Sequence, residues 1–210
     1  TGLTLHAELK SIKEKAFYYC TNLSGNLEFL YEGSSVGNEA FCGCIQLTQI
    51  RNFNRISSFD DGAFKKCTQL GINGQMNFNE NLQSIPSYLF YQCSNLNSAL
   101  IITDTIKNIG SFAFYECSKL TLKTDLDLSS INCIEKYTFY GCNHLNGKLI
   151  LSDTISEIEE YSFYNCSQLN NLKTIKGEDL SIGEYAFYGC TSFNGQLIIY
   201  SDIKLLGNEC

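Results

Sequence analysis

The stretch Ile109-Gly110-Ser111-Phe112-Ala113-Phe114-Tyr115-Glu116-Cys117-Ser118-Lys119-Leu120 recurs along the chain with small variations. Within it, an isoleucine stands eight residues before a cysteine, a phenylalanine three before it and a leucine three after it. The cysteine returns every 23 to 26 residues. We call these the ladder cysteines: Cys20, Cys44, Cys67, Cys93, Cys117, Cys142, Cys166 and Cys190. This period is typical of a solenoid, whose coils bury an apolar face only by stacking on their neighbours.

The positions around each ladder cysteine are equally regular. The phenylalanines three residues before it are Phe17, Phe41, Phe64, Phe90, Phe114, Phe139, Phe163 and Phe187. An Ile, Val or Phe stands eight residues before each ladder cysteine, and a Leu, or once Phe193, stands three after it. Equivalent residues of stacked coils are therefore expected to form buried ladders through one continuous core.

Two kinds of local structure are expected within a coil. Segments such as 126–128, 149–151 and 197–199 predict short strands that stacking aligns in parallel. The run from Tyr185 to Cys190 places Phe and Cys three residues apart, which predicts one helical turn facing inward. The expected fold is a repeat solenoid of about eight coils of 23–26 residues, built from short parallel strands and helical turns.

The two ends of the chain fall inside the repeat. Residues 2–5 match 147–150, and residues 206–210 match 182–186. We therefore expect residues 1–210 to be a single solenoid unit and an internal fragment of a longer protein. Any contact with a membrane would then be made by segments outside this fragment.

Charge and motifs exclude several classes of function. The net charge is −7, and Arg51 and Arg55 are the only arginines, so the clustered cations that nucleic-acid binding requires are missing. There is no catalytic motif, and neither His6 nor His144 stands in a recognisable site. The sequence predicts neither an enzyme nor a cofactor or metal site.

The repeat resembles the BspA-like class of leucine-rich repeats, on the motif Ile-Gly-x-x-Ala-Phe-x-x-Cys-x-x-Leu quoted above, and the resemblance covers essentially the whole chain. It implies a leucine-rich-repeat solenoid. Many members are surface proteins of mucosal bacteria and protozoan parasites, and several are adhesins, so the resemblance implies a cell-surface or extracellular location. The lack of Trp, the single Pro86 and the abundant Asn, Ser and Tyr look more like the protozoan-parasite branch.

The chain has eleven cysteines, and their regular spacing favours a packing role for most of them. A free thiol behaves as a small buried hydrophobe, so the ladder cysteines are expected to stay reduced and to react slowly. Cys42, Cys133 and Cys210 lie off the ladder and are expected to be the more reactive thiols; their oxidation state is left open. Cys42-Gly43-Cys44 alone is a weak signal for zinc, because a second ligand pair is missing.

Tyrosine is the residue with the most promise for binding. Ten of the 13 tyrosines stand two or five residues before a ladder cysteine, and Phe112 takes one further place. Positions three apart on a helical turn share a face, so a double stripe is expected. The stripe can serve partner binding, coil-to-coil stacking, or both. Its candidate partner-binding residues are Tyr88, Tyr91, Tyr115, Tyr137, Tyr140, Tyr161, Tyr164, Tyr185 and Tyr188.

The strand face offers a competing surface. Its expected outward residues differ between coils, as in Gln75, Asp127, Lys148 and Gln196. The irregular run 51–55 holds both arginines, as a local basic spot or simply an irregular coil. Asn22 and Asn165 begin glycosylation sequons.

The function predicted from these observations is a binding module that attaches to a protein or cell-surface ligand, with host adhesion as the leading role. The alternative is a structural or self-associating scaffold module.

Overall fold

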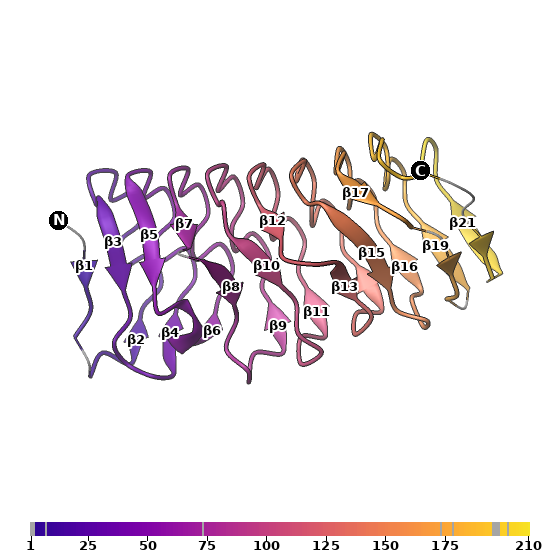
Figure 1. Ribbon diagram of the computed structural model, residues 1–210. Helices are drawn as coiled ribbons and strands as arrows, with labels where there is room; N and C mark the ends of the chain where they lie inside the picture. The colour runs from indigo at the N-terminus through magenta and orange to yellow at the C-terminus, as the bar shows by residue number, and fades with distance from the viewer. Residues whose placement is uncertain are drawn as a thin grey trace.

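The computed structural model describes residues 3–6, 8–72, 74–172, 174–177, 179–194, 198–200 and 202–210. The chain winds along one axis in stacked coils (Figure 1). Each coil has one strand before the ladder cysteine, at least one strand after it, and a turn segment that carries the Phe and Cys. All pairings between described strands are parallel. The predicted repeat solenoid is thus confirmed.

The strands that follow the ladder cysteines, together with β1, form the front face in Figure 1. They are β1 (Leu3–Thr4), β3 (Gly25–Glu28), β5 (Leu47–Arg51), β7 (Gly71–Ile72), β8 (Gln75–Asn77), β10 (Ala99–Ile101), β12 (Thr121–Leu122), β13 (Leu126–Leu128), β15 (Gly147–Leu151), β17 (Leu169–Asn170), β18 (Thr174–Ile175) and β20 (Ile198–Ile199). The expected strand at 197–199 is described only from Ile198, because Leu197 lies outside the described residues.

The strands that precede the turn segments form the back face. They are β2 (Ser11–Ile12), β4 (Ser34–Val36), β6 (Ile56–Phe59), β9 (Ser84–Ile85), β11 (Asn108–Ile109), β14 (Cys133–Ile134), β16 (Glu157–Ile158), β19 (Leu180–Ile182) and β21 (Ile203–Leu206). One 3₁₀ helix, η1 (Phe53–Arg55), lies between β5 and β6.

The turn segments are not helical, so the helical turn expected at 185–190 is wrong. Along each segment, the backbone N–H groups donate alternately to a carbonyl of the same coil and to a carbonyl of the next coil. Tyr140 N donates to the Tyr137 carbonyl of its own coil, whereas Phe139 N donates to Ser162 of the next coil. Two residues of each segment are left-handed, in this case Tyr137 at φ 57° and Gly141 at φ 71°. A helix would keep every N–H within the coil, so these turns give up helical bonding to link the coils.

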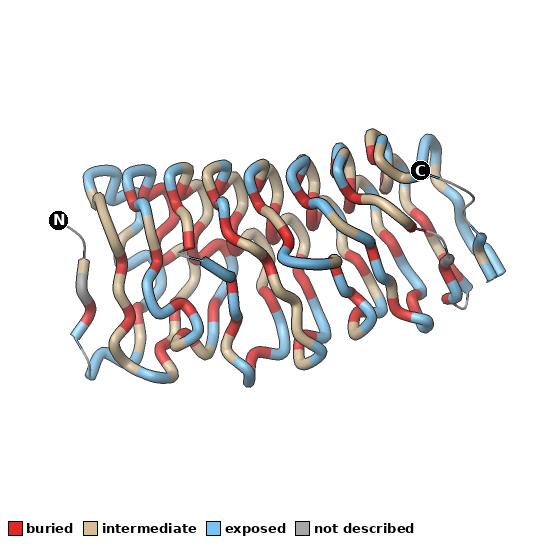
Figure 2. The backbone as a smooth tube through the Cα atoms, in the orientation of Figure 1, coloured by how far each residue is buried: buried red, intermediate tan, exposed pale blue. Residues whose placement is uncertain are grey.

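The repeated apolar positions form the core, as predicted. The eight ladder-motif phenylalanines make one stack, with 5.0 to 5.9 Å between neighbouring ring centroids. The six inner phenylalanines, from Phe41 to Phe163, are fully buried, and the apolar residues eight before each ladder cysteine are buried too. Figure 2 shows buried and exposed residues alternating around the coils. Residues repeated by the period are therefore the residues that hold the coils together.

The front face is not one continuous sheet. β7 pairs with β5, whereas β8, which follows it in the same coil, pairs with β10. The spacing from Cys67 to Cys93, 26 residues, is the longest in the chain and contains this break. The same division recurs in two later coils of ordinary length. There β12 pairs with β10 but β13 with β15, and β17 pairs with β15 but β18 with β20.

Candidate binding surfaces

Two columns of aromatic rings run side by side along the turn segments. In the column five residues before the ladder cysteines, successive ring centroids are 4.6 to 5.0 Å apart. In the column two residues before them, the spacing is 4.6 to 5.1 Å. We call the ten residues the aromatic slab: Tyr88, Tyr91, Phe112, Tyr115, Tyr137, Tyr140, Tyr161, Tyr164, Tyr185 and Tyr188. All nine candidate tyrosines are brought together.

The two columns also contact each other. Rings of one coil lie 5.6 to 5.8 Å apart at tilted or edge-on angles, as for Tyr137 and Tyr140. Tyr188 is 44% exposed, and the other rings are half-buried. Each ring therefore packs on its neighbours with part of its surface and leaves the rest open to solvent. A surface ordered in this way gives up little side-chain entropy when a partner binds.

The backbone, and not a helix, sets the position of the first column. Tyr88, Phe112, Tyr137, Tyr161 and Tyr185 have φ between 54° and 59°, in the left-handed region. A non-glycine residue pays about 1 to 2 kcal/mol for that conformation. Ring stacking and the hydrogen bond from each of these N–H groups to the next coil offset the cost. The prediction that the two positions share a face holds, although its helical reason does not.

Three tyrosines in the middle of the slab are uncharged at physiological pH. Burial raises the pKa of Tyr115 to about 12, and burial also raises the pKa values of Tyr137 and Tyr140. Their hydroxyl groups therefore stay protonated and able to donate hydrogen bonds. At one end of the slab, the Lys65 ammonium lies 4.9 Å from the Tyr88 ring centroid and 3.7 Å from Glu39. A cation–π contact and an ion pair thus place charged side chains at the Tyr88 end of the slab.

The ladder thiols have a structural use that the sequence did not predict. From the second ladder cysteine on, each Sγ–H donates to the Phe carbonyl of the preceding coil, at 3.0 to 3.1 Å. Burial raises the pKa of Cys44 and Cys190 to about 12, and raises those of the ladder thiols between them. All eleven cysteines are free. Seven ladder thiols are thus buried, protonated and hydrogen-bonded, whereas Cys20 in the first coil is exposed.

The prediction that all three off-ladder thiols are reactive is wrong for Cys42. Its side chain is 2% exposed, and burial followed by the charge of Glu39 raises its pKa. Cys42 stands two residues before a ladder cysteine, where the coils from Cys93 on have a slab tyrosine, and its side chain is much shorter than that of tyrosine. Cys133 is half-buried, with a pKa raised to about 12 by burial and by Glu157. Cys210 is exposed.

The remaining candidates from the sequence lie on the surface. Asn22 and Asn165 are both exposed. The exposed His144 donates from Nδ1 to the Ser118 carbonyl at 2.6 Å, and the same nitrogen lies 2.8 Å from Asn143 Oδ1. Of the described residues, Cys133, Glu157 and Glu159 alone form a group that could offer three ligand atoms to a metal ion, all within 4.8 Å of one another. The Cys133 thiol is protonated at neutral pH, so this group is not a ready thiolate site.

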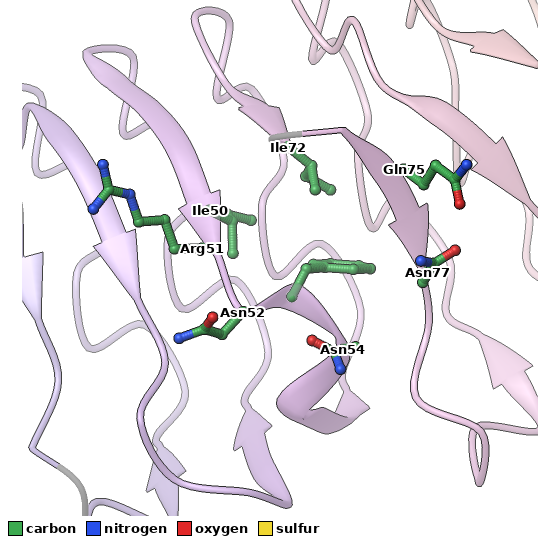
Figure 3. Close-up of a pocket in the computed structure, with 8 residues that line it drawn as sticks. Ile50, Arg51, Asn52, Asn54, Ile72, Gln75 and Asn77 are labelled. Carbon is green, nitrogen blue, oxygen red and sulfur yellow. The ribbon is translucent and has the colours of Figure 1, made fainter.

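The strand face carries the outward residues that were expected there. Gln75, Asp127 and Lys148 are exposed, and Gln196 lies outside the described residues. The two arginines differ: Arg55 donates to the Leu30 carbonyl at 2.7 Å and serves the fold, whereas Arg51 is exposed. Arg51 borders a hollow of about 630 Å³ at the break between β5 and β8, shown in Figure 3. The sequence did not predict this hollow.

Within the described residues, no helix has the length and apolar character needed to cross a lipid bilayer. No curated protein matches the sequence. Among solved structures, the T. pallidum leucine-rich-repeat protein TpLRR is 23% identical, with a TM-score of 0.63 over 92% of this chain and 78% of that one. A leucine-rich-repeat protein from Bacteroides ovatus is also 23% identical, with a TM-score of 0.53 over 90% of this chain and 58% of that one.

A third structure, from Eubacterium ventriosum, is 16% identical, with a TM-score of 0.54 over 96% of this chain and 60% of that one. At these identities the likeness is one of fold. A comparison with protein-family models matches the BspA type leucine-rich-repeat region to residues 1–121 and 121–210. The match spans the chain, and the apolar residues that recur in each repeat of this chain are the ones buried in the structure. The chain therefore belongs to the BspA-type leucine-rich-repeat family.

Proposed function

We propose that the chain is a cell-surface module that binds a partner protein through the aromatic slab, with adhesion to a host surface as its role. Leucine-rich repeats generally mediate protein interactions. The single observation that carries the choice of surface is the slab itself: nine tyrosines and one phenylalanine, packed in two ordered columns and partly open to solvent.

The physical properties of the slab suit a protein partner. Tyrosine is enriched at interfaces and at their energetic hot spots, because its ring supplies contact area and its hydroxyl supplies a hydrogen bond. The rings are held in place before binding, so binding has little ordering cost. The neutral hydroxyl groups add directional contacts without the desolvation penalty of a charge. A binding role, and not catalysis, follows from this set of properties.

The proposed surface location is supported by the family of the chain and by the resemblance of its motif to surface adhesins. The assignment to the protozoan branch stays a prediction from composition. The solved structures described above come from bacteria.

The test is binding of the purified protein to immobilised extracellular-matrix proteins and to cultured epithelial cells. Its mass in solution is measured in parallel by sedimentation at several concentrations. We expect saturable binding by a protein of constant mass. A mass that rises with concentration, without binding to any matrix protein or cell, would contradict the proposal and favour the self-associating module.

A further inference from the structure

A polar groove crosses the front face where the sheet is interrupted. Its first hollow, of about 630 Å³, has the side chains of Asn52, Asn54, Gln75 and Asn77 in its lining (Figure 3). A second hollow, of about 440 Å³, is lined in part by Asn26, Gln49 and Asn97. Both hollows share Ile72, so they adjoin. We call the two together the amide groove, after these seven carboxamide side chains.

The groove is a consequence of the divided strand. β8 pairs with β10 and not with β5, so the sheet opens between β5 and β8. Below the opening, Asn52 at φ 55° starts η1, which turns Phe53 inward to pack 5.2 Å from Phe78. The floor is therefore apolar, made of Ile50, Phe53 and Ile72, each at most 4% exposed. The volumes lie within the roughly 300–1,000 Å³ range of small-molecule sites.

The groove is nearly free of charge in a protein whose net charge is −7. None of the described residues in its lining is acidic, and Arg51 is their single cation. With the Asn26 carboxamide oxygen turned toward Arg51, that oxygen accepts from Nε at 3.3 Å and from Nη2 at 2.9 Å. Figure 3 shows the guanidinium on the side away from Gln75 and Asn77. A ligand that depends on a formal charge meets one charged group in the first hollow, the Arg51 guanidinium, and that group is already hydrogen-bonded to Asn26.

Carboxamides offer a different kind of recognition. Each one carries two N–H donors and a carbonyl acceptor, so it pairs with groups that both donate and accept. Gln75 and Asn77 are exposed, and their side chains have no hydrogen-bond partner among the residues that the structure describes. Asn52, by contrast, donates to the Phe29 carbonyl at 3.0 Å and serves the fold. Gln75 and Asn77 are thus the side chains most available to a ligand.

We infer that the amide groove binds an uncharged β-linked oligosaccharide, laid along the solenoid axis. Every sugar hydroxyl both donates and accepts, as the carboxamides do, and the C–H faces of the rings match the apolar floor. The lining residues come from four successive coils, from Asn26 to Asn97, so the groove is long enough for several linked sugars. This site is separate from the aromatic slab and does not depend on its role.

The experiment is a titration of the ¹⁵N-labelled protein with a panel of neutral tetrasaccharides: β-1,4- and β-1,3-linked glucose, β-1,4-linked N-acetylglucosamine, mannose, xylose and galactose. Tetragalacturonate is the charged comparison, and an uncharged extended octapeptide is the non-sugar comparison. Side-chain NH₂ resonances of Asn and Gln report directly on the groove. We expect at least one neutral sugar to shift the Gln75 and Asn77 signals.

The variant Gln75→Ala with Asn77→Ala should bind that sugar about 10-fold more weakly, as expected for the loss of two sets of hydrogen bonds. The matched control is Asn146→Ala with Gln168→Ala, which removes two exposed carboxamides outside the groove; it should bind within about 2-fold of the parent, by the same reasoning. The inference is overturned if no neutral sugar binds, if both variants weaken binding equally, or if tetragalacturonate or the peptide binds more tightly than every neutral sugar.

Discussion

Raising the pH toward 10 is expected to unfold the protein. At that pH the buried ladder thiols keep their protons in the folded state, whereas the thiols of the unfolded chain lose theirs. The ordinary thiol pKa of 9.0 rises to about 12 for Cys44 and Cys190, and burial raises it for the five ladder thiols between them. Since the folded-state pKa is the higher one, the folded state holds protons that the unfolded chain releases. Stability is full below about pH 9 and is lost as the pH rises toward 12.

The magnitude follows from the number of buried thiols. At pH 10, about one unit above the unfolded pKa, each thiol lowers the free energy of unfolding by about 1.4 kcal/mol. Seven thiols together lower it by roughly 10 kcal/mol, which is comparable to the whole stability of a typical domain. Tyr115 adds to the loss between pH 10 and about 12, because its pKa is also raised by burial.

The assay is urea unfolding, followed by circular dichroism, at pH 7.5 to 10.5 in the presence of a reductant. The logarithm of the unfolding constant should rise by close to seven per pH unit near pH 10, one for each thiol. The variant Cys142→Ala should lower this slope by about one and serves as the control. A free energy of unfolding that stays constant from pH 8 to 10 would refute the buried, protonated ladder.

Further predictions concern the core and the exposed thiols. Phe139→Ala should lower the free energy of unfolding by about 3 to 5 kcal/mol, since the ring is fully buried between two stacked phenylalanines. Tyr140→Ser should lower it clearly less, because its ring is half-exposed. Equal losses of the two variants in urea unfolding would contradict the buried phenylalanine ladder. Ellman's reagent at pH 8 should react promptly with Cys20 and Cys210, the two exposed thiols, and should react with all eleven only after denaturation. Prompt reaction of most thiols in the native protein would contradict the burial of the ladder cysteines.

The sequence predicts the buried positions well because each one is repeated in every coil. A residue such as Phe139 faces the same neighbours as its equivalents, so its period reports its burial. The turn conformation is harder to predict, because a Phe and a Cys three residues apart fit both a helical turn and the observed alternating turn. Gly141, Asn165 and Gly189, each just before a ladder cysteine, carry the missed signal, since Gly and Asn favour the left-handed backbone found there.

Features that break the period are the least predictable. The amide groove depends on which neighbour each half of a divided strand pairs with. The 26-residue spacing before Cys93 does not predict it, because strands also divide in coils with spacings of 24 and 25 residues. Cys42 was expected to be reactive because it stands off the ladder. Cys42 is nonetheless buried, and its place in the repeat did not predict this because the coils from Cys93 on have a partly exposed tyrosine at the same position.

The central claim is that the aromatic slab recognises a partner protein. It is tested most directly with the variant Tyr137→Asn, Tyr140→Ser, Tyr161→Asn and Tyr164→Ser, in which Asn is used where the backbone is left-handed. The control is Tyr31→Ser with Tyr200→Ser, which removes tyrosines outside the slab.

The measurement is the Kd of each folded variant for the matrix protein or cell surface that the parent binds, with folding checked by circular dichroism. We predict that the slab variant binds about 100-fold more weakly or worse, as expected when several hot-spot rings are removed, and that the control binds like the parent. An unchanged Kd in the folded slab variant would contradict the claim and move recognition to another face of the solenoid.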